Sequence, residues 1–477
     1  MPPVETTGHH GTGQPRAAWP PSFGYDWGKG KPRWKLDARS DLYIYFYLHG
    51  LSLLNEKGAF CFITSNSRLD VGHGRDLQRF LLTRGQVKLV IDNQARRSFE
   101  ADVNTVIVLL GAPQDARSDR KESLEHTARF VMLTLPFEEV LDPIIWEEVV
   151  EASDRRTMRE YRVHPARQAD LLQSGMDPQK GRYTGDKWGG KYLRAPDIYW
   201  SILEKGKGKL VRLGDIAEVR FGIKTGANEF FYLDEERIRQ WGIGEECLRP
   251  VIKSAKDSQM LLLDPDQLPT FLFLCHKEKR QLTATNVLRY IEWGEAQGFN
   301  EVRSVRGRRR WYDVGRKEPA DAIILRRIGE RCPVFEANGV LEDCVLFGIT
   351  RRTSDIGLHA FLGCLNATWT RLYIETMTRQ LTGAQAVSDT NVYVTRHTLI
   401  IDVAQLTNTT SRLLERRYLA VRGRASVSIF KEAEMPDRRA LDDIIFDVLG
   451  LTQGERDAVY EAVINQVGAR LSKARSV

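Results

Sequence analysis

Close cysteine pairs, long apolar runs and a readable targeting segment are all missing from this 477-residue sequence. Its six cysteines are scattered singly, so neither a zinc site nor a CxxC redox motif is predicted, and they are interpreted as plain buried thiols. No window approaches the roughly 18 unbroken apolar residues that a membrane span needs. The N-terminal stretch has no basic run followed by an apolar one, which favours a cytoplasmic location.

The chain carries a moderate excess of positive charge, +7 at pH 7. Each phosphate contact made by Lys or Arg gains from counterion release, so this charge is compatible with a polyanionic partner such as nucleic acid. Many proteins that bind no nucleic acid are equally basic, and the charge alone does not decide the question. The length predicts two or three domains, and the hydrophobic fraction of 42% is ordinary for a globular protein.

Helical and strand patterns alternate after an irregular arm at residues 1–40. Apolar residues at helical spacing predict a helix over 41–58 that ends at Gly58. The alternation within residues 41–112 is typical of an α/β sheet. After the first helix, the predicted elements are a buried strand, a helix and two further strands: 59–65, 75–82, 87–92 and 103–110.

The pattern weakens over residues 113–186, which are interpreted as a connector. A new unit is predicted over 187–430, where short β-like runs are interrupted by Gly222 and Gly226 and mixed structure follows. A single helix is predicted over 358–379. This part of the chain is therefore expected to have a mixed α+β fold.

The last segment, residues 431–477, predicts two amphipathic helices, 437–451 and 453–474. Gly450 is the expected end of the first, since glycine adopts the left-handed conformation that ends many helices. The apolar stripes of both helices favour packing on the protein over contact with DNA.

Three early segments, DLYIYF, AFCFITSNS and SFEADVNTVIVLL, carry a family resemblance through their order and spacing. Together they resemble the catalytic domain of gamma-type N6-adenine DNA methyltransferases, the class of the TaqI methyltransferase and many Type IIG restriction-modification proteins. They match the helix after the family's catalytic loop, its fifth strand and its final hairpin. The resemblance implies that residues 41–112 are part of a class I S-adenosylmethionine-dependent methyltransferase sheet, which is Rossmann-like.

The resemblance also implies roles for two aromatic side chains of these segments. Phe46 would lie against the adenine ring of S-adenosylmethionine, and Phe99 would pack on the target base that is flipped out of the duplex. A base that leaves the duplex loses its stacking and needs an apolar surface in its place. Ser65 and Asn66 follow the carboxyl end of a strand, where open α/β sheets bind ligands, here the cofactor. The alternatives are that the two rings are core side chains and that Ser65 and Asn66 form a simple turn.

Four later segments, LRAPDIYW, RLGDIAEVRFGIKTGANEFFYL, RRRWYDVGRKEPADAII and LNATWTRLYIE, resemble the target-recognition domain that follows the catalytic domain in the same enzymes. The resemblance implies double-stranded DNA as the partner. In the glycine-rich loop, Lys224, Thr225 and Asn228 are predicted to contact phosphates or base edges, because small residues let the backbone approach DNA closely. The alternative is that Gly222 and Gly226 form hairpin turns.

A basic segment beside an aromatic residue is the second predicted DNA contact. Positive charge next to an aromatic ring suits contact with the DNA backbone. The alternative is a solvated basic loop. The candidate side chains are Arg306, Arg308, Arg309, Arg310 and Trp311, with Arg303 just before them.

Two loops that methyl transfer to adenine requires in this family are missing from the sequence. One is the glycine-rich cofactor loop, and the other is an Asn-Pro-Pro-aromatic loop that holds the target amine. The segment Met1-Pro2-Pro3-Val4 has Met and Val where the second loop needs Asn and an aromatic residue. No catalytic residue is therefore predicted in this chain, and the cofactor site is expected to be incomplete. An N-terminal methyltransferase half, separately encoded or lost by truncation, would complete a sheet that otherwise has a bare edge.

Three functions remain open at this point. The first is a site-specific DNA adenine-N6 methyltransferase of a restriction-modification or phage-defence system, whose activity in this chain alone stays uncertain. The second is a non-catalytic DNA-binding specificity subunit. The third, a restriction endonuclease subunit, is disfavoured, because Pro196-Asp197 and Glu204-Lys205-Gly206 depart by one place from the spacing of a nuclease metal site.

Overall fold

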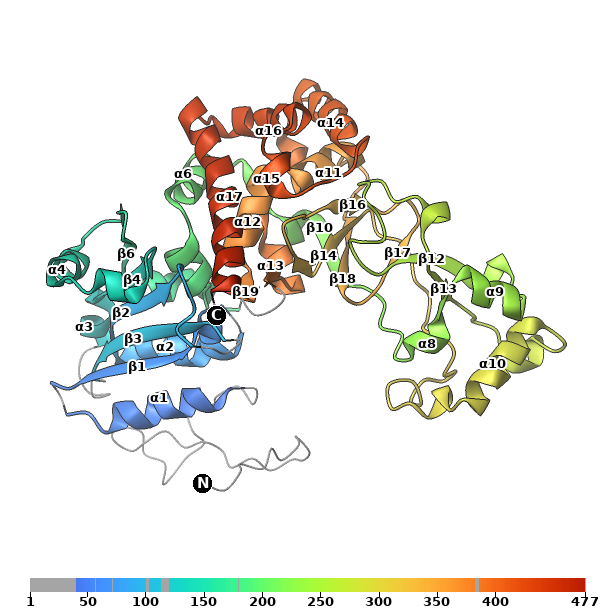
Figure 1. The fold of residues 1–477 in the computed structure, drawn as a ribbon, viewed down its shortest axis with the longest axis horizontal. Helices are drawn as coiled ribbons and strands as arrows, with labels where there is room; N and C mark the ends of the chain where they lie inside the picture. The colour runs from blue at the N-terminus through green and yellow to red at the C-terminus, as the bar shows by residue number, and fades with distance from the viewer. Residues whose placement is uncertain are drawn as a thin grey trace. The chain divides into compact units, whose positions relative to one another are not determined.

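The computed structural model describes residues 40–55, 57–70, 72–99, 103–112, 120–178, 180–381 and 386–476. The predicted N-terminal arm, with Met1-Pro2-Pro3-Val4, lies outside the described residues except for its last residue. The chain forms two compact units, residues 1–194 with 475–477, and residues 195–474. Figure 1 labels their helices and strands. Among the described residues, no helix combines the length and apolar character that crossing a bilayer requires.

The first unit is built on a six-stranded sheet with the order β1-β3-β2-β4-β6-β5. The three strands predicted near its start are confirmed as β1 (Ala59–Ser65), β2 (Gln86–Asn93) and β3 (Thr105–Gly111). β3 lies between the other two and is antiparallel to both. β1 and β2 consequently point the same way, and their carboxyl ends meet at one edge of the sheet. β1 is the first strand of the sheet, with a neighbour on one side only among the residues described.

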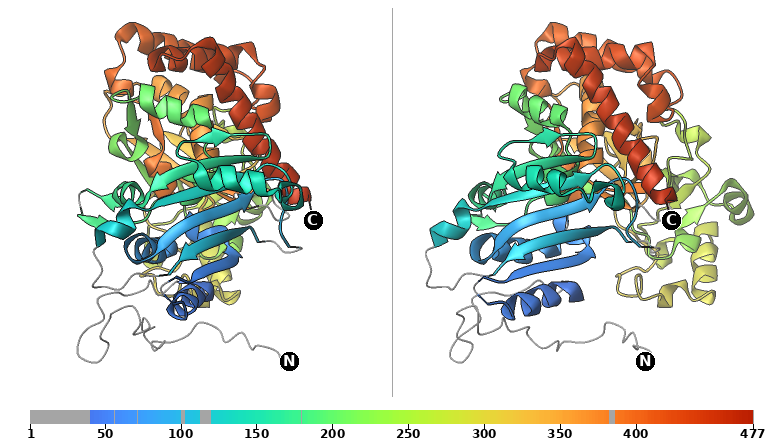
Figure 2. Two further views of the ribbon diagram at one scale, coloured as in Figure 1. Left: turned by 90° about the vertical axis from the view of Figure 1, so that its left-hand side faces the viewer. Right: turned by 60° about the vertical axis from the view of Figure 1, so that its left-hand side comes forward.

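Helix α1 (Leu42–Ser52) lies alongside β1, as all three views show (Figures 1 and 2). It begins at Asp41, whose carboxylate accepts a hydrogen bond from the Leu42 N–H at 2.6 Å. The prediction that this helix ends at Gly58 was wrong, because the helix already ends at Ser52, with Leu53 as its C-cap. The Gly58 carbonyl instead accepts a hydrogen bond from the Ala112 N–H at 3.0 Å. The hydrogen bonding between β1 and β3 therefore already begins at Gly58.

The segment interpreted as a connector extends the same sheet. It contributes β4 (Thr127–Leu133), which is parallel to β2, and β6 (Tyr161–Arg167), which is antiparallel to β4. β6 alternates polar with apolar side chains, and so lacks the unbroken apolar run that marked β1. Other elements of the unit are α2 (Arg75–Arg84), α3 (Arg120–Glu125), α4 (Pro143–Glu151), β5 (Arg156–Thr157), α5 (Gln168–Ser174), β7 (Met176–Asp177), β8 (Arg182–Tyr183) and a π-helical turn, Gly189–Arg194.

The second unit contains two four-stranded sheets, each with its own strand order. The first sheet has the order β10 (Ala217–Phe221), β18 (Leu346–Arg351), β14 (Ala322–Leu325) and β16 (Val334–Glu336), all antiparallel. The second has the order β11 (Tyr232–Leu233), β13 (Phe271–Phe273), β12 (Leu248–Ile252) and β17 (Leu341–Glu342). The unit has two main hydrophobic cores, one centred on the first sheet and the C-terminal helices, and one around Phe230 and Tyr290.

The helix predicted over 358–379 is in fact two helices, α11 (Leu358–Asn366) and α12 (Thr368–Met377). Ala367 between them has an extended backbone, with φ −64° and ψ 150°. The carboxylate of Asp442 accepts hydrogen bonds from the Thr368 N–H at 2.7 Å and from its hydroxyl at 2.6 Å. A side chain 74 residues away thus satisfies the first free N–H group of α12 and stabilises the break.

The two C-terminal helices are confirmed as α16 (Pro436–Leu449) and α17 (Gln453–Arg475). Gly450 ends α16 in the left-handed conformation, with φ 72°. The remaining elements are α6 (Asp197–Lys205), β9 (Leu210–Arg212), α7 (Leu213–Ile216), α8 (Asn228–Phe231), α9 (Glu235–Trp241), α10 (Asn286–Ala296), β15 (Arg327–Ile328), β19 (Arg379–Leu381), β20 (Val387–Asp389), α13 (Val392–His397), β21 (Leu399–Ile401), α14 (Asn408–Arg422) and α15 (Ile429–Glu432).

All six cysteines are free thiols, but only half are buried. The interpretation as buried thiols is therefore correct for three of them and wrong for Cys61, which is exposed on the edge strand β1. Cys332 and Cys344 are half-buried, and Cys247, Cys275 and Cys364 are buried.

Candidate functional site

The carboxyl ends of β1 and β2 form a polar edge in the first unit. Asn66 follows β1 directly, and its Nδ2 donates to Oδ2 of Asp92, on β2, at 3.3 Å. Its N–H donates to the Asn104 carbonyl, just before β3, at 2.9 Å. Ser65 accepts a hydrogen bond from the Ser67 N–H at 3.3 Å and so begins a 3₁₀ turn. The two residues thus form a turn, and the turn brings the Asn66 side chain to the edge where the three strands meet.

Helix α1 holds the end of β1 in place through two tyrosines. The hydroxyls of Tyr43 and Tyr47 lie 3.0 Å from Ser67 Oγ and Thr64 Oγ1, respectively. Arg68 donates to Thr64 Oγ1 at 3.1 Å, and its guanidinium lies 4.7 Å from the centre of the Tyr47 ring. Burial raises the pKa of Tyr47, so this phenol stays neutral and able to donate. The loop after β1 is therefore fixed by hydrogen bonds rather than left to solvent.

Asp70 anchors the same loop at its far end, which the sequence did not indicate. Its carboxylate accepts a hydrogen bond from the Gly190 N–H at 3.0 Å and pairs with Arg194 at 3.0 Å. A Cβ at Gly189 would lie 2.6 Å from Oδ2 of Asp70, so a larger residue there would displace this carboxylate. These partners lie about 120 residues away along the chain, and no local pattern marks them.

Phe46 and Phe99 are both exposed, to 54% and 50% of their surface. The alternative that they are core aromatics is therefore wrong. Phe46 lies on α1 next to Tyr47, and Phe99 lies in the loop between β2 and β3, which leaves the sheet at the polar edge. Half-exposed phenyl rings offer apolar surface to a planar ligand. Their exposure is compatible with the roles that the resemblance implies.

In the second unit, the glycine-rich loop and the basic segment lie against each other although about 80 residues separate them. Ser304 donates its hydroxyl to the Gly226 carbonyl at 2.7 Å. Arg308 donates to the carbonyls of Thr225 at 2.6 Å and Lys224 at 3.3 Å. The sequence named both segments as DNA contacts, and the structure brings them into one surface.

The two glycines of the loop have different roles, and neither forms a hairpin turn. β10 pairs with β18 rather than with the next strand along the chain. A Cβ at Gly222 would lie 2.1 Å from the Asp343 carbonyl oxygen, so the backbones approach too closely for any other residue. Gly226 has φ +80°, the left-handed conformation that favours glycine.

Four cations of these two segments are exposed and form what we call the basic rim. Three of them come from the basic segment, and one comes from the glycine-rich loop. Asn228 is exposed close by, at the start of α8, and accepts a hydrogen bond from the Thr225 hydroxyl, which leaves its amide N–H groups free to donate elsewhere. The members of the basic rim are Lys224, Arg303, Arg306 and Arg309.

Thr225 and Trp311 require a correction, because both side chains are buried. Thr225 is 1% exposed. Trp311 packs 4.4 Å from Phe230 between ring centres, and its Nε1 donates to Glu295 Oε1 at 2.8 Å. A side chain that the protein covers does not face a DNA duplex, so both residues support the surface from below.

Arg308 and Arg310 also contact other parts of the protein, so they are not members of the basic rim. The guanidinium of Arg308 lies 5.5 Å from the centre of the Phe231 ring and braces the glycine-rich loop. Arg310 is 21% exposed and pairs with Glu278 at 2.7 Å and with Asp313 at 2.5 Å, whereas Arg309 is 87% exposed and reaches the same Glu278 at 3.3 Å. These two carboxylates raise the pKa of Arg310, and the charge they neutralise is no longer available to a phosphate.

Replacing Trp311 with phenylalanine is expected to destabilise the second unit by about 1–2 kcal/mol, because the change removes part of a packed ring and the hydrogen bond to Glu295. Urea unfolding followed by circular dichroism measures this difference. Arg306→Ala is the control, expected to change stability by no more than about 0.5 kcal/mol because the side chain is exposed. Equal effects of the two variants would contradict the assignment of Trp311 to the core.

The residues of the disfavoured nuclease motif lie on one helix. Asp197, Glu204 and Lys205 are all on α6. Lys205 donates to Glu455 at 2.6 Å, and Glu204 pairs with Lys207. In the described parts of the chain, no three His, Cys, Asp or Glu side chains are close enough to hold a metal ion.

Two protein-family models match the chain and together cover more than half of it. The C-terminal domain of the Type II methyltransferase M.Eco57I matches residues 186–384. The Eco57I restriction-modification methylase model matches residues 29–99. The first match contains the basic rim, and the second contains α1, β1 and the polar edge.

Individual relatives are distant. The Type II methyltransferase M.AccI of Acinetobacter calcoaceticus is 22% identical over 319 residues, which are 64% of this chain and 52% of the relative. M.XamI of Xanthomonas campestris pv. amaranthicola is 23% identical over 345 residues, 69% of this chain and 54% of the relative. The chain thus spans about half the length of these relatives. Among solved structures, the Type IIL restriction-modification enzyme MmeI in complex with DNA has a TM-score of 0.49 at 13% identity, over 90% of this chain and 52% of that one.

Proposed function

The chain belongs to the Type II restriction-modification methylase family, and from this premise we propose that it supplies the base-contacting and DNA-recognition parts of a site-specific DNA adenine-N6 methyltransferase. The observation that carries the proposal is the half-exposed Phe99 ring in the loop that leaves the polar edge. The basic rim of the second unit supports it, since exposed Lys and Arg side chains bind the phosphates of a duplex.

Phe99 would replace the stacking that the target adenine loses when it leaves the duplex. An aromatic face suits any base, so this contact holds the base without selecting it. Selection would come from the second unit, where Asn228 offers a side-chain amide beside the cations of the basic rim.

The described residues fit one wall of a site for S-adenosylmethionine. Phe46 offers an exposed ring to the adenine of the cofactor, and Ser65 and Asn66 offer polar atoms at the carboxyl end of β1. The bound cofactor supplies the methyl group on its sulfonium. We propose that a complementary N-terminal methyltransferase part provides the cofactor loop and the Asn-Pro-Pro-aromatic loop, and covers the side of β1 that has no neighbour among the described residues.

Co-expression of this chain with the product of the upstream reading frame tests the proposal. Transfer of label from S-adenosylmethionine to adenine N6 in duplex DNA is expected for the pair. A second readout is binding of the cofactor, measured by calorimetry, which Phe46→Ala is expected to weaken. Binding of specific DNA by a pair that neither binds the cofactor nor transfers methyl groups would favour the second candidate, a non-catalytic specificity subunit, which the basic rim supports by itself.

Phe99→Ala in the reconstituted pair is expected to lower kcat/KM for methyl transfer about 10-fold to 100-fold, because stacking on one base contributes about 1–3 kcal/mol. DNA affinity through the second unit should change little. The matched control is Phe137→Ala, which removes another partly exposed phenyl ring of the first unit and should leave the rate unchanged. Equal loss in both variants would indicate a folding effect and contradict the role of Phe99.

A further inference from the structure

A phenyl ring lies open to solvent at the end of strand β10 in the second unit. Phe221 is 62% exposed, and among the described residues of this unit it is the most exposed large apolar side chain. Ala217 and Val219 of the same strand are buried. Because side chains alternate along a strand, Phe221 lies on the same face as these two, beyond the part that the core covers. The ring is therefore an apolar surface that a partner can reach.

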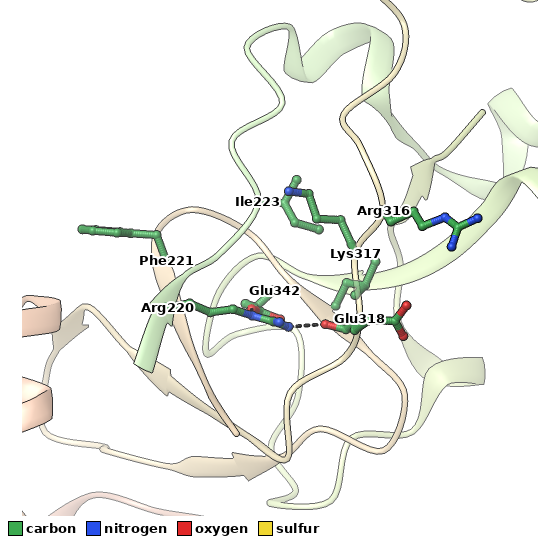
Figure 3. Close-up of a pocket in the computed structure, with 8 residues that line it drawn as sticks. Arg220, Phe221, Ile223, Arg316, Lys317, Glu318 and Glu342 are labelled. Carbon is green, nitrogen blue, oxygen red and sulfur yellow. Dashed lines mark hydrogen bonds and ion pairs between the residues drawn. The ribbon is translucent and has the colours of Figure 1, made fainter. Parts of the chain in front are cut away.

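Contacts on both sides hold the end of this strand in place. Phe221 is the register partner of Phe347 on β18, and the two rings meet edge to face at 5.3 Å between their centres. The preceding Arg220 donates to Glu342 Oε1 at 3.3 Å and to the Glu318 carbonyl, the contact that the dashed line marks in Figure 3. Figure 3 shows the Phe221 ring and the Arg220 side chain extending in opposite directions. A ring whose position is fixed before binding loses little conformational entropy on contact with a partner.

Positive charge lies close to the ring. Phe221 lines a pocket of about 210 Å³ together with Arg316 and Lys317, and both cations are exposed. Lys224 of the basic rim follows Phe221 by three residues along the chain. Glu318 is an exposed acid beside Lys317, and the three cations outnumber it. Exposed cations around an apolar ring favour a polyanionic partner, which in this unit is the duplex that the basic rim is proposed to bind.

We propose that Phe221 reads a thymine of the recognition sequence through apolar contact with its C5-methyl group in the major groove. The inference rests on the proposed binding of DNA and names a residue that selects. The thymine methyl group is the apolar group that base edges present in this groove. A phenyl ring pressed on the donors and acceptors of another base would leave them without hydrogen-bond partners, which is costly. Arg316 and Lys317 bind flanking phosphates and so hold the ring against the groove.

Replacement of thymine by uracil tests the inference, because it removes only the methyl group. Selection from randomised duplexes by the purified 477-residue chain supplies the sequence, which is expected to contain at least one thymine. Each thymine is then replaced singly, and affinity is measured by fluorescence anisotropy. For the wild-type chain, one replacement is expected to weaken binding about fourfold, the effect of burying one methyl group. Phe221→Ala is expected to bind the thymine and uracil duplexes alike at that position.

The matched control is Leu413→Ala, which shortens another exposed apolar side chain of the second unit, on α14. This variant should keep the fourfold preference for thymine. Should Phe221→Ala not fold, Phe221→Gln takes its place, because it exchanges the ring for a polar side chain. The same loss of preference is expected for it, and an unchanged preference would overturn the inference.

Failure of this inference can be told apart from failure of the proposed function. A selected sequence without thymine, a wild-type chain that responds to no uracil, or a Phe221→Ala variant that keeps the fourfold preference overturns the inference and leaves DNA recognition standing. An equal loss of affinity for both duplexes, with the preference retained, would show that the ring contacts DNA without reading the methyl group. If the wild-type chain selects no sequence at all, the proposed DNA recognition fails, and the inference fails with it.

Discussion

Replacing Glu375 with alanine is expected to destabilise the second unit by about 3–5 kcal/mol, because the change leaves two arginines buried without their counter-charge. Glu375 lies on α12 and is fully buried. Its carboxylate pairs with Arg371 at 3.0 Å and with Arg470, on α17, at 2.7 Å. Ser388 adds a hydrogen bond at 2.7 Å. Although burial alone would raise the pKa of Glu375, the two arginines hold it below its usual value, so the group is ionised in the folded protein.

The control for this variant is an exposed pair with the same spacing along its helix. Glu235 and Arg239 lie four residues apart on α9 and are 3.8 Å apart, in solvent. Glu235→Ala is expected to cost no more than about 0.5 kcal/mol. Thermal and urea unfolding of the two variants give the comparison. A loss below about 1 kcal/mol for Glu375→Ala would contradict an ionised buried cluster, because a neutral acid leaves no counter-charge to remove.

Elements whose cause is local could be predicted from the sequence. The strands β1, β2 and β3 follow from short segments rich in apolar residues, and the end of α16 follows from Gly450. The break between α11 and α12 could not be predicted, because Asp442 stabilises it from another helix. The strand β6 was not predicted, and its alternating polar and apolar residues are stabilised by pairing with β4. The strand β4 was also missed, although the apolar residues 130–133 are a local signal for a strand.

In the candidate site, too, the sequence predicted local features and missed those that depend on distant contacts. The sequence indicated which two segments of the second unit carry charge and glycine, but not which side chains face outward. Thr225 and Trp311 are buried, and Arg310 is neutralised by two carboxylates, whereas Arg306 and Arg309 of the same run are exposed.

The basic rim leads to the second large expected effect, on DNA affinity and its salt dependence. Changing all four of its cations to alanine is expected to lower affinity for duplex DNA on the order of a thousandfold at about 0.1 M salt, because each phosphate contact releases counterions. The slope of log K against log salt concentration is expected to become less steep by about 3–4, because each phosphate contact contributes about 0.9 to it. Fluorescence anisotropy at several salt concentrations measures both quantities. Stability should be unchanged, since all four side chains are exposed.

The matched control removes the same charge from other elements of the second unit. Lys207, Arg412, Arg416 and Lys431 are exposed as well. Arg412 and Arg416 lie on α14 and Lys431 on α15, which Figure 1 places among the C-terminal helices, apart from α8 and α10. If affinity depended on net charge alone, the two quadruple variants would bind alike, because they carry the same charge. A contact surface at the basic rim requires that only the first variant loses affinity and salt slope, so equal losses would contradict it.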